Sequence, residues 1–541
     1  MWNRRQFLFD NSAGLWLTAT DGREIKIRIL DDGTSRPTAA RVRLLDAQGA
    51  EVIPIGHPMS LAENAVEGDV SFNAKRFCYV DGSFSVPASA LPLRYQVVKG
   101  YEYAAAEGTL SRESVRDAGA QIRLRRWSSL KSRGWRGGDV HIHHISPKTC
   151  RLEMEAEDLD VANILTSDFT EDQAEFEGRL NANSTRDRLV YVAQEFRHDH
   201  LGHMCVLNLK KLIAPVKPMR KEHFPLHISA CDEAHAQGGY VAWAHFPSWP
   251  GLESPLDVAL EKLDGLEILS VLDPREFPVF VRQVVPEIAA NDGLRLWYRF
   301  LNCGFRLTAT AGTDKMTTFV TVGANRVYAK VDGEFSYANW IRALKTGQTF
   351  VTNSPVLEFS VNGREAGSTI AIAGTGRKVQ VAASAESQLP YDRLEIVANG
   401  VVIHDATPSG PRYKSRIDLE FPVERSCWIA ARVVEDMAAY RARKVNFPGV
   451  HQALGTRHGD YFGTRRPETV FAHTTPAYII HDGHPIRSAE DAEYYIRYLD
   501  AAAAWLDKEG KFARPSDKKT TLEAFDGARK IYQRRAGEAR R

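Results

Sequence analysis

The sequence predicts a multidomain protein of mixed α/β and β structure, in which a parallel α/β sheet or barrel stands between two β domains and helices close the chain. Its 541 residues are too many for one ordinary core, and about 150 residues per domain suggests three or four units. Apolar residues alternate with period two in the first and third parts of the chain, whereas the middle part alternates short apolar runs with helical stretches.

Residues 1–133 are expected to form an N-terminal β-sandwich domain with a linker. Residues 24–29 alternate apolar and charged side chains, and turn pairs such as Asp81-Gly82 separate the strands. Short strands with frequent turns are typical of a small antiparallel sandwich. The basic stretch at residues 123–136 is expected to lead into the next domain.

Residues 134–354 are expected to form the α/β domain. Its expected strands are residues 161–165, 204–209, 239–244, 266–269 and 307–311, and its expected helices are residues 175–180, 228–237 and 278–290. Strand–helix alternation over this length implies a parallel sheet or a barrel. The strands are almost continuously apolar, which fits burial on both faces.

Residues 355–486 return to β patterns and are expected to form a C-terminal β-sandwich domain, interrupted by a long polar excursion at residues 446–466. Residues 487–541 have helical periodicity. Ser488 stands three residues before Asp491, as an N-capping residue does at the start of a helix.

The bulk composition excludes several classes of partner. The net charge of +2 gives no field that favours nucleic acid, and no apolar run approaches the roughly 20 residues that span a bilayer. We therefore expect a small-molecule substrate, no nucleic-acid partner and no membrane partner. The two β domains offer surfaces through which the chain could form oligomers.

Cysteine usage indicates the compartment. The six cysteines are scattered without a CxxC spacing, which is typical of reduced thiols in a reducing compartment. The pair Arg4-Arg5 resembles the start of a twin-arginine export signal, but polar residues 10–12 follow where such a signal is apolar. A cytoplasmic location is expected, or a periplasmic one if an export signal has been removed.

The middle domain opens on three histidines at the end of a short strand. His141 and His143 stand two residues apart, so their side chains project to the same side. Two imidazoles at a strand's end are a ready chelate for a divalent metal. His144 projects the opposite way and is expected to be a supporting residue at most.

Glu195 ends the next apolar strand, at residues 189–194, where a carboxylate suits the bridging of two metals. His203 is the best ligand among the histidines that follow, because the strand that it introduces fixes its backbone. His198 and His200 are expected to be loop or supporting residues.

His245 and Asp314 end two further apolar runs. In a barrel of parallel strands the reactive face lies at the C-terminal ends of the strands. Five candidates share such a position: His141, His143, Glu195, His245 and Asp314. Asp168 also follows a strand, and the sequence leaves open whether it ligates a metal or caps the next helix.

Four segments of the middle domain resemble the motifs of the polymerase-and-histidinol-phosphatase (PHP) superfamily, namely residues 138–143, 195–203, 244–247 and 311–314. Members of this superfamily have a distorted (β/α)7 TIM-like barrel with one to three divalent metals. The longer architecture is similar to the carbaryl-hydrolase-like branch, in which a β domain precedes the barrel. Stretches like those at residues 325–328, 349–353 and 472–476 recur in that branch, so the resemblance covers most of the chain.

The resemblance implies the role of individual residues. It assigns metal ligation to His141, His143, Glu195, His203, His245 and Asp314. Among these six, Glu195, His245 and Asp314 are expected to be catalytic. The chain departs from the PHP pattern at Phe169 and Met316, where many members have a histidine. Because two ligands are missing, a third metal is not expected, and one or two ions remain, zinc or manganese.

The expected reaction is hydrolysis. A divalent metal lowers the pKa of bound water to about 7, which favours attack by metal-bound hydroxide. The branch implies an aryl carbamate or carboxylic ester as substrate, and the wider superfamily implies a phosphoester. Arg197, Arg275 and Lys315 are available near the motifs but form no phosphate-cradling pattern. A binding protein with a vestigial barrel is the alternative from another functional class.

Overall fold

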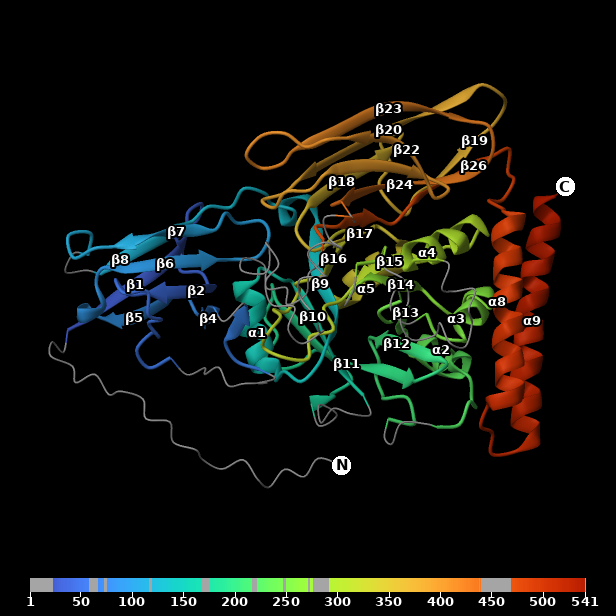
Figure 1. Cartoon of the computed structure of the whole chain (residues 1–541), viewed down its shortest axis with the longest axis horizontal. Coiled ribbons are helices and arrows are strands. Elements are labelled where there is room, and N and C mark those ends of the chain that lie inside the picture. The colour runs from blue at the N-terminus through green and yellow to red at the C-terminus, as the bar shows by residue number, and fades with distance from the viewer. Residues whose placement is uncertain are drawn as a thin grey trace.

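The computed structural model describes residues 23–57, 67–72, 75–115, 119–167, 175–216, 221–246, 250–270, 273–275, 291–436, 438 and 469–540. A β domain lies at one end of the molecule and a curled α/β sheet in the middle (Figure 1). A C-terminal β layer covers one side of that sheet, and two long helices stand at the other end. The predicted multidomain α/β architecture is confirmed.

Two sheets form the N-terminal β domain. One has the order β5-β1-β8, with β1 at Glu24–Asp31, β5 at Ser83–Pro87 and β8 at Ala120–Leu124. The other has the order β3-β4-β2-β6-β7, with β2 at Ala40–Leu45, β3 at Val70–Phe72, β4 at Lys75–Val80, β6 at Leu93–Val98 and β7 at Ala106–Leu110. Alternating apolar residues such as Ile27 and Val42 fill one shared core. The expectation of a purely antiparallel sandwich was wrong in one pair, because β1 and β8 run parallel.

Seven consecutive strands form the curled part of the central sheet: β9 (Trp135–Ile142), β10 (Val161–Thr166), β11 (Leu189–His198), β12 (Gly202–Leu207), β13 (Tyr240–Trp243), β14 (Gly265–Leu269) and β15 (Thr308–Ala311). Their residues are almost all buried, as expected for strands that are covered on both faces. The chain after β15 returns to the end of β9 through a parallel bridge between Ile142 and Lys315. The ends of the first and last strands therefore lie together.

The curled sheet departs from a regular (β/α)7 barrel. β12 runs antiparallel to both β11 and β13. Helices α1 (Pro147–Ala156), α2 (His227–Ala236), α3 (Ser254–Ala259) and α4 (Gly293–Asn302) lie between strands, but among the described residues no α-helix connects β11 to β12. That connection is a hairpin with only residues 199–201 between the strands, which is too short for a crossover helix.

The helix expected at residues 175–180 was wrong. This segment is irregular apart from a bridge between Leu180 and Tyr191. Gly178 adopts φ +67°, and a Cβ there would meet the Lys210 carbonyl oxygen at 2.3 Å, so the chain turns instead of continuing a helix. The expected helix at 278–290 and the excursion at 446–466 lie outside the described residues.

The central sheet continues beyond β9 into the C-terminal β layer. β16 (Arg326–Lys330) pairs with β9, and the order continues through β17 (Thr349–Thr352), β25 (Ala472–Thr474), β24 (Cys427–Val434), β21 (Arg393–Ala398) and β22 (Val401–Ala406). β19 (Thr369–Ile372) and β26 (Ala477–His481) pair beside β24, and β18 (Val356–Val361), β20 (Arg377–Glu386) and β23 (Ser415–Val423) form a separate sheet. Hydrogen-bonded strands thus join the α/β region to the C-terminal β layer without a break.

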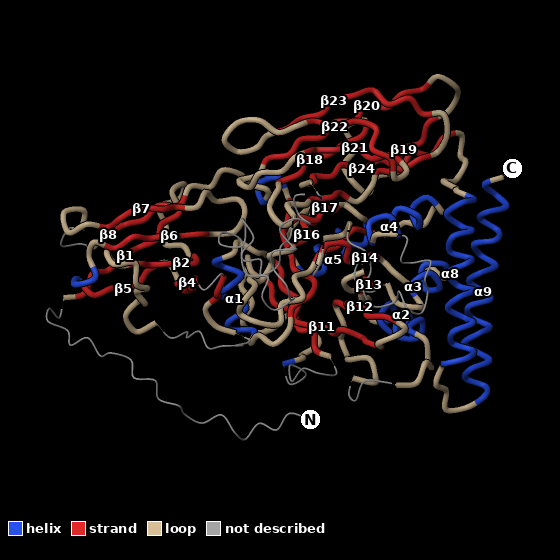
Figure 2. Tube along the Cα trace, viewed as in Figure 1, coloured by secondary structure: helices blue, strands red, loops and turns tan. Residues whose placement is uncertain are grey.

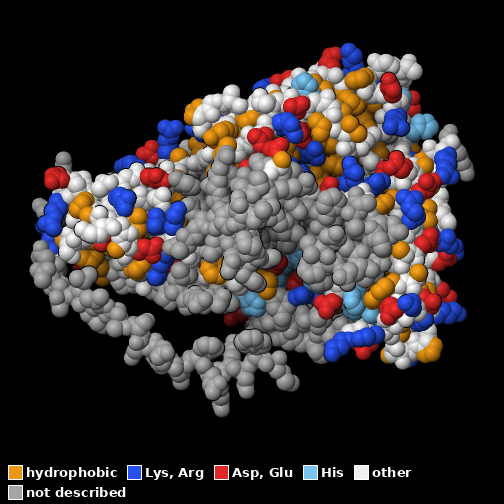
Figure 3. Space-filling view, in the orientation of Figure 1, with side chains coloured by type: hydrophobic (Ala, Val, Ile, Leu, Met, Phe, Trp, Pro, Cys, Tyr) orange, Lys and Arg blue, Asp and Glu red, His pale blue; other side chains and the backbone are white. Residues whose placement is uncertain are grey.

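Helices complete the structure (Figure 2). α5 (Tyr337–Thr346) connects β16 to β17, and α8 (Ala489–Glu509) and α9 (Pro515–Ala539) form an antiparallel pair that packs on α3. The Ser488 side chain accepts a hydrogen bond from Asp491 N at 3.2 Å, which confirms the predicted N-cap. No helix among the described residues is long and apolar enough to cross a membrane. On the face seen in Figure 3, acidic and basic side chains are interspersed.

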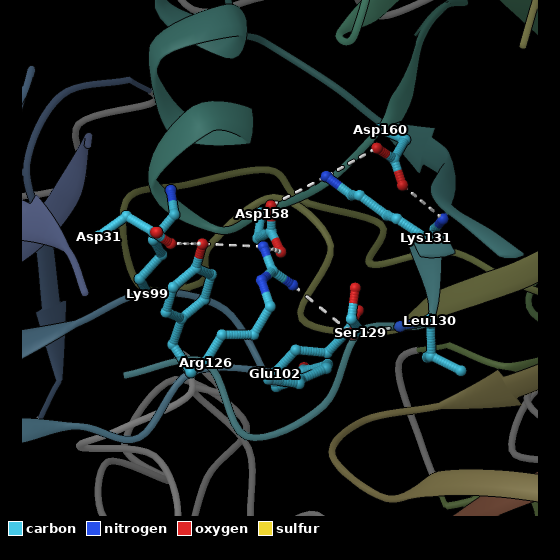
Figure 4. Close-up of polar contacts among 12 residues, drawn as sticks. Asp31, Lys99, Glu102, Arg126, Ser129, Leu130, Lys131, Asp158 and Asp160 are labelled. Atoms are coloured by element: carbon cyan, nitrogen blue, oxygen red, sulfur yellow. Dashed lines mark hydrogen bonds and ion pairs between the residues drawn. The ribbon is translucent and has the colours of Figure 1, made fainter. Parts of the chain in front are cut away.

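A buried group of charges fixes the starts of β9 and β10 (Figure 4). The Asp158 carboxylate lies 2.8 Å from Arg126, 2.9 Å from Lys131 and 2.9 Å from Arg188. Asp160 lies 2.9 Å from Lys131 and accepts a hydrogen bond from Gly137 N at 2.9 Å. Because Arg126 follows the N-terminal β domain and Asp158 precedes β10, this group ties that domain to the central sheet.

We predict that Asp158→Asn destabilises the protein by about 3–5 kcal/mol, because it leaves buried cations without their counter-charge. Burial raises the pKa of Asp158, but Lys131, Arg188 and Arg126 outweigh burial and hold it well below its ordinary value. The stabilisation is therefore present above the unfolded pKa of about 3.9 and is lost as the pH falls through the folded pKa. Asparagine tolerates the φ of +51° at this position.

Urea denaturation at pH 7 measures the loss of stability in Asp158→Asn, and its repetition at pH 3 measures how the contribution of Asp158 depends on pH. The exposed pair Asp418–Arg416 is the matched control, and Asp418→Asn should leave the midpoint unchanged. Equal midpoints for Asp158→Asn and the unaltered protein at pH 7 would contradict the prediction.

Candidate metal centre

His141 and His143 converge at the end of β9. Both rings are buried, and their Nε2 atoms lie 3.0 Å apart. Nδ1 of His143 donates to the Leu165 carbonyl oxygen at 2.7 Å, so in the neutral ring Nε2 is the nitrogen with the lone pair, and it faces His141. Two facing imidazole lone pairs repel each other unless one nitrogen carries a proton or both face a cation.

Glu195 and Asp314 complete a first ligand set around these two nitrogens. Nε2 of His143 lies 3.4 Å from Glu195 Oε2 and 3.8 Å from Asp314 Oδ1. Nε2 of His141 lies 3.8 Å from Glu195 Oε1 and 3.5 Å from Asp314 Oδ1. Zinc bonds of about 2.0–2.2 Å in a tetrahedron place ligand atoms roughly 3.3–3.6 Å apart, and these separations lie within a few tenths of an ångström of that range, close to the spacing around one divalent ion.

A second ligand set lies on the other side of Glu195. Oε1 of Glu195 is 3.2 Å from Nδ1 of His203 and 3.5 Å from Nε2 of His245. The two imidazole nitrogens are 3.1 Å apart. This set also has the separations of a metal site, and its three members are buried.

Glu195 belongs to both sets, with Oε2 nearest His143 and Oε1 nearest His203 and His245. Burial raises its pKa, but Arg197 and the three neighbouring histidines outweigh burial and hold the pKa well below its usual range. The carboxylate is therefore ionised at neutral pH. A carboxylate with two available oxygens is the group that can bridge two ions.

The surroundings shift the pKa values of the other candidate ligands in different directions. Burial lowers the pKa of His203 to about 3, so this imidazole is neutral and its lone pair is available. Burial raises the pKa of Asp314, but His141, His245 and His143 lower it below its ordinary value. Burial disfavours protonation of His141, yet Cys205, Glu267 and Asp314 raise its pKa well above the usual value. The surroundings of His141 thus favour positive charge.

Two of the candidate ligands lie on strained backbone. His245 has φ +32° and Asp314 has φ +47°, in the region that non-glycine residues rarely adopt. Such conformations cost about 1–3 kcal/mol and persist where the surroundings impose them, most often at functional sites. Gly312 precedes Asp314 because a Cβ there would meet His141 Cβ at 2.4 Å.

Sequence reasoning missed two residues beside His141. Glu267 Oε2 lies 3.2 Å from His141 Nδ1, and Cys205 Sγ lies 3.4 Å from the same nitrogen. Glu267 is fully buried in β14, whose residues 265–269 are otherwise apolar. A buried acid within an apolar strand was the signal that could have found it.

The remaining candidates lie outside both sets. His144 is half-buried beside His143, with ring centroids 6.1 Å apart, and Asp168 lies outside the described residues. His198 and His200 form a separate group with His223, in which His200 Nδ1 and His223 Nε2 are 2.9 Å apart. Lys511 N donates to His223 Nδ1 at 2.9 Å, so this group holds the turn between α8 and α9.

Only one of the three cations considered for phosphate binding faces the site. Arg197 Nε lies 3.6 Å from Glu195 Oε2. Lys315 is buried and donates to the carbonyl oxygens of Thr317 and Val320. Arg275 forms an ion pair of 2.9 Å with Asp273.

Comparisons with known proteins add little to this geometry. No family model matches the chain, and no curated protein matches it. Among solved structures, PsfC from Pseudomonas syringae PB-5123 is similar over 38% of this chain and 88% of its own, with 14% sequence identity and a TM-score of 0.27. A likeness of this size establishes neither a shared fold nor a shared function.

We predict that Glu195→Gln loses at least one metal equivalent and more than about 100-fold of any hydrolytic activity. The substitution keeps the shape of the side chain but removes the charge that both ligand sets share. The loss should exceed the range of about 10–100-fold that is typical of residues supporting a ligand. Elemental analysis and turnover of the same preparation provide the measurement.

His144→Asn is the matched control, because asparagine tolerates the φ of +54° at this position. It should keep its metal and stay within about 10–100-fold of the unaltered activity. Full metal in Glu195→Gln, together with metal loss in His144→Asn, would mean that the site lies on the other face of the strand end.

Proposed function

We propose that this protein is a metal-dependent hydrolase with a binuclear site of the PHP type, held on a distorted (β/α)7 barrel. The observation that carries the proposal is the pair of ligand sets that share Glu195, one with His141, His143 and Asp314 and one with His203 and His245. All six side chains offer nitrogen or oxygen atoms that suit zinc or manganese. Two ions bound there would lower the pKa of water and polarise the oxygen of a carbonyl or phosphoryl group.

The residues define the side from which substrate would arrive. The side chains of His141, His143, Glu195 and His203 are at most 2% exposed, whereas Asp314 is 16% and His245 is 9% exposed. Solvent therefore reaches the ligand sets at Asp314 and His245. An open coordination position, which catalytic sites keep, would face this side.

The charges favour an ester or carbamate over a phosphoester. Phosphate recognition usually uses arginine or lysine in a clamp. Lys315 and Arg275 are engaged elsewhere, and Arg197 lies against Glu195. An aryl carbamate or carboxylic ester carries no net charge at the reacting group and needs no such clamp.

Metal content tests the proposal directly. We expect about two equivalents of divalent metal per chain after reconstitution with zinc or manganese, and hydrolysis that is lost on chelation and restored by metal. Elemental analysis with dialysed protein is the measurement. Far less than about one equivalent, with no gain on reconstitution, would instead support a binding protein with a vestigial site.

Substrate preference is a separate prediction. The metal-loaded protein should hydrolyse 1-naphthyl N-methylcarbamate or a related aryl ester with a higher kcat/KM than p-nitrophenyl phosphate, because the phosphate clamp is missing. Steady-state rates with both compounds at equal metal loading compare them. A clear preference for the phosphomonoester would favour the phosphoesterase alternative.

A further inference from the structure

We infer that Glu267 is a positioning residue that holds one ligand of each metal set in place. Its carboxylate contacts the His141 ring from the first set and the His245 main chain from the second set. The inference rests on the proposed function, since it concerns how the same two sets are oriented. Glu267 itself belongs to neither set.

The first contact orients His141. Glu267 Oε2 lies 3.2 Å from His141 Nδ1, on the opposite side of the ring from the other ligands. The same oxygen accepts a hydrogen bond from the main-chain N–H of His245, so it acts as an acceptor here and Nδ1 is the nitrogen that carries hydrogen. When the ring is neutral, Nε2 is then the nitrogen that presents a lone pair toward His143 and Asp314. Carboxylates in this place fix the tautomer and the orientation of metal-binding histidines.

The second contact orients His245. The main-chain N–H of His245 donates to the same oxygen of Glu267, and Phe246 N donates to the Glu267 carbonyl oxygen at 3.1 Å. Two successive N–H groups after β13 are therefore held by one residue of β14. These bonds impose the left-handed backbone of His245, which aims its ring at His203 and Glu195.

The surroundings are shaped to admit this carboxylate. Glu267 is fully buried, and burying a carboxylate costs free energy of folding unless it is paired or hydrogen-bonded. A Cβ at Gly312 would meet Glu267 Oε1 at 2.2 Å, so the glycine before Asp314 leaves room for it. Cys205 Sγ also lies 3.4 Å from His141 Nδ1, but a thiol is a weak acceptor, so the Glu267 carboxylate is the stronger partner of this nitrogen.

Two substitutions of Glu267 test the inference by zinc binding rather than activity. Glu267→Met keeps the volume but removes both acceptors, and we expect each zinc dissociation constant to rise by about 10–100-fold. Glu267→Gln keeps one acceptor oxygen and should give a smaller rise at both positions. Competition with a chromophoric chelator measures both constants on the full chain, and circular dichroism shows whether each variant is folded.

Glu253 supplies a matched control. It is fully buried and lies 2.9 Å from Nδ1 of His227, a histidine that belongs to neither set. Glu253→Met and Glu253→Gln should lower thermal stability while the zinc constants stay unchanged. If both Glu253 variants weakened zinc binding as much as the Glu267 variants do, Glu267 would be a purely structural residue and the inference would be wrong.

The remaining outcomes are decisive as well. A folded Glu267→Met protein with both zinc constants unchanged would overturn the inference and leave the proposed function standing. If Glu267→Met did not fold, an unchanged pair of constants in Glu267→Gln would overturn it instead. Failure of the unaltered protein to bind zinc or manganese would overturn the proposed function and this inference with it.

Discussion

The candidate site depends on the contact between the end of β9 and the chain that follows β15. Two main-chain hydrogen bonds make this contact, from Asp314 N to His141 O and from His143 N to Lys315 O, both at 2.8 Å. The buried Asp139 carboxylate reinforces it by accepting hydrogen bonds from His141 N and from the chain after β15. Because β9 and β15 are the first and last strands of the curled part of the sheet, closure places Asp314 beside the two histidines.

Neighbouring elements hold β9 in the position that closure requires. On one edge it pairs with β10, whose start is fixed by the buried charges around Asp158 and Asp160. On the other edge it pairs with β16, and Trp340 of α5 packs where a Cβ at Gly138 would come within 2.3 Å. The N-terminal β domain and the C-terminal β layer therefore act on the site through one strand. Support of β9 from both sides is a physical reason why a long chain surrounds a small site.

Sequence patterns could predict several strand ends but not the partners across space. The strand end expected at Glu195 was wrong, because β11 continues through it to His198 and pairs with β12 there. His141, Glu195, His245 and Asp314 each interrupt an apolar run, which is a local signal, and the structure brings them together. The sequence did not reveal the role of Glu267 for two reasons. Both faces of β14 are buried, so no alternation of apolar and polar residues marks one position as different, and the contact between Glu267 and His141 joins residues far apart in the sequence. The hairpin between β11 and β12 could not be predicted from the sequence, because apolar runs do not specify the direction of a strand.

The charge of the site gives the strongest physical argument for a cation. Glu195, Glu267 and Asp314 converge in a region that is almost closed to solvent. Apart from histidines, Arg197 is the one cationic side chain among the described residues that pairs with any of these three carboxylates. Buried carboxylates that are not balanced by positive charge are strongly destabilising. The balance must come from protons on imidazoles such as His141, whose pKa the nearby acids raise, or from divalent ions that displace those protons. Because burial lowers the pKa of His203 to about 3 and the neighbouring cations and histidines hold that of Glu195 well below its usual range, neither of these two side chains carries a proton at neutral pH that a cation would have to displace.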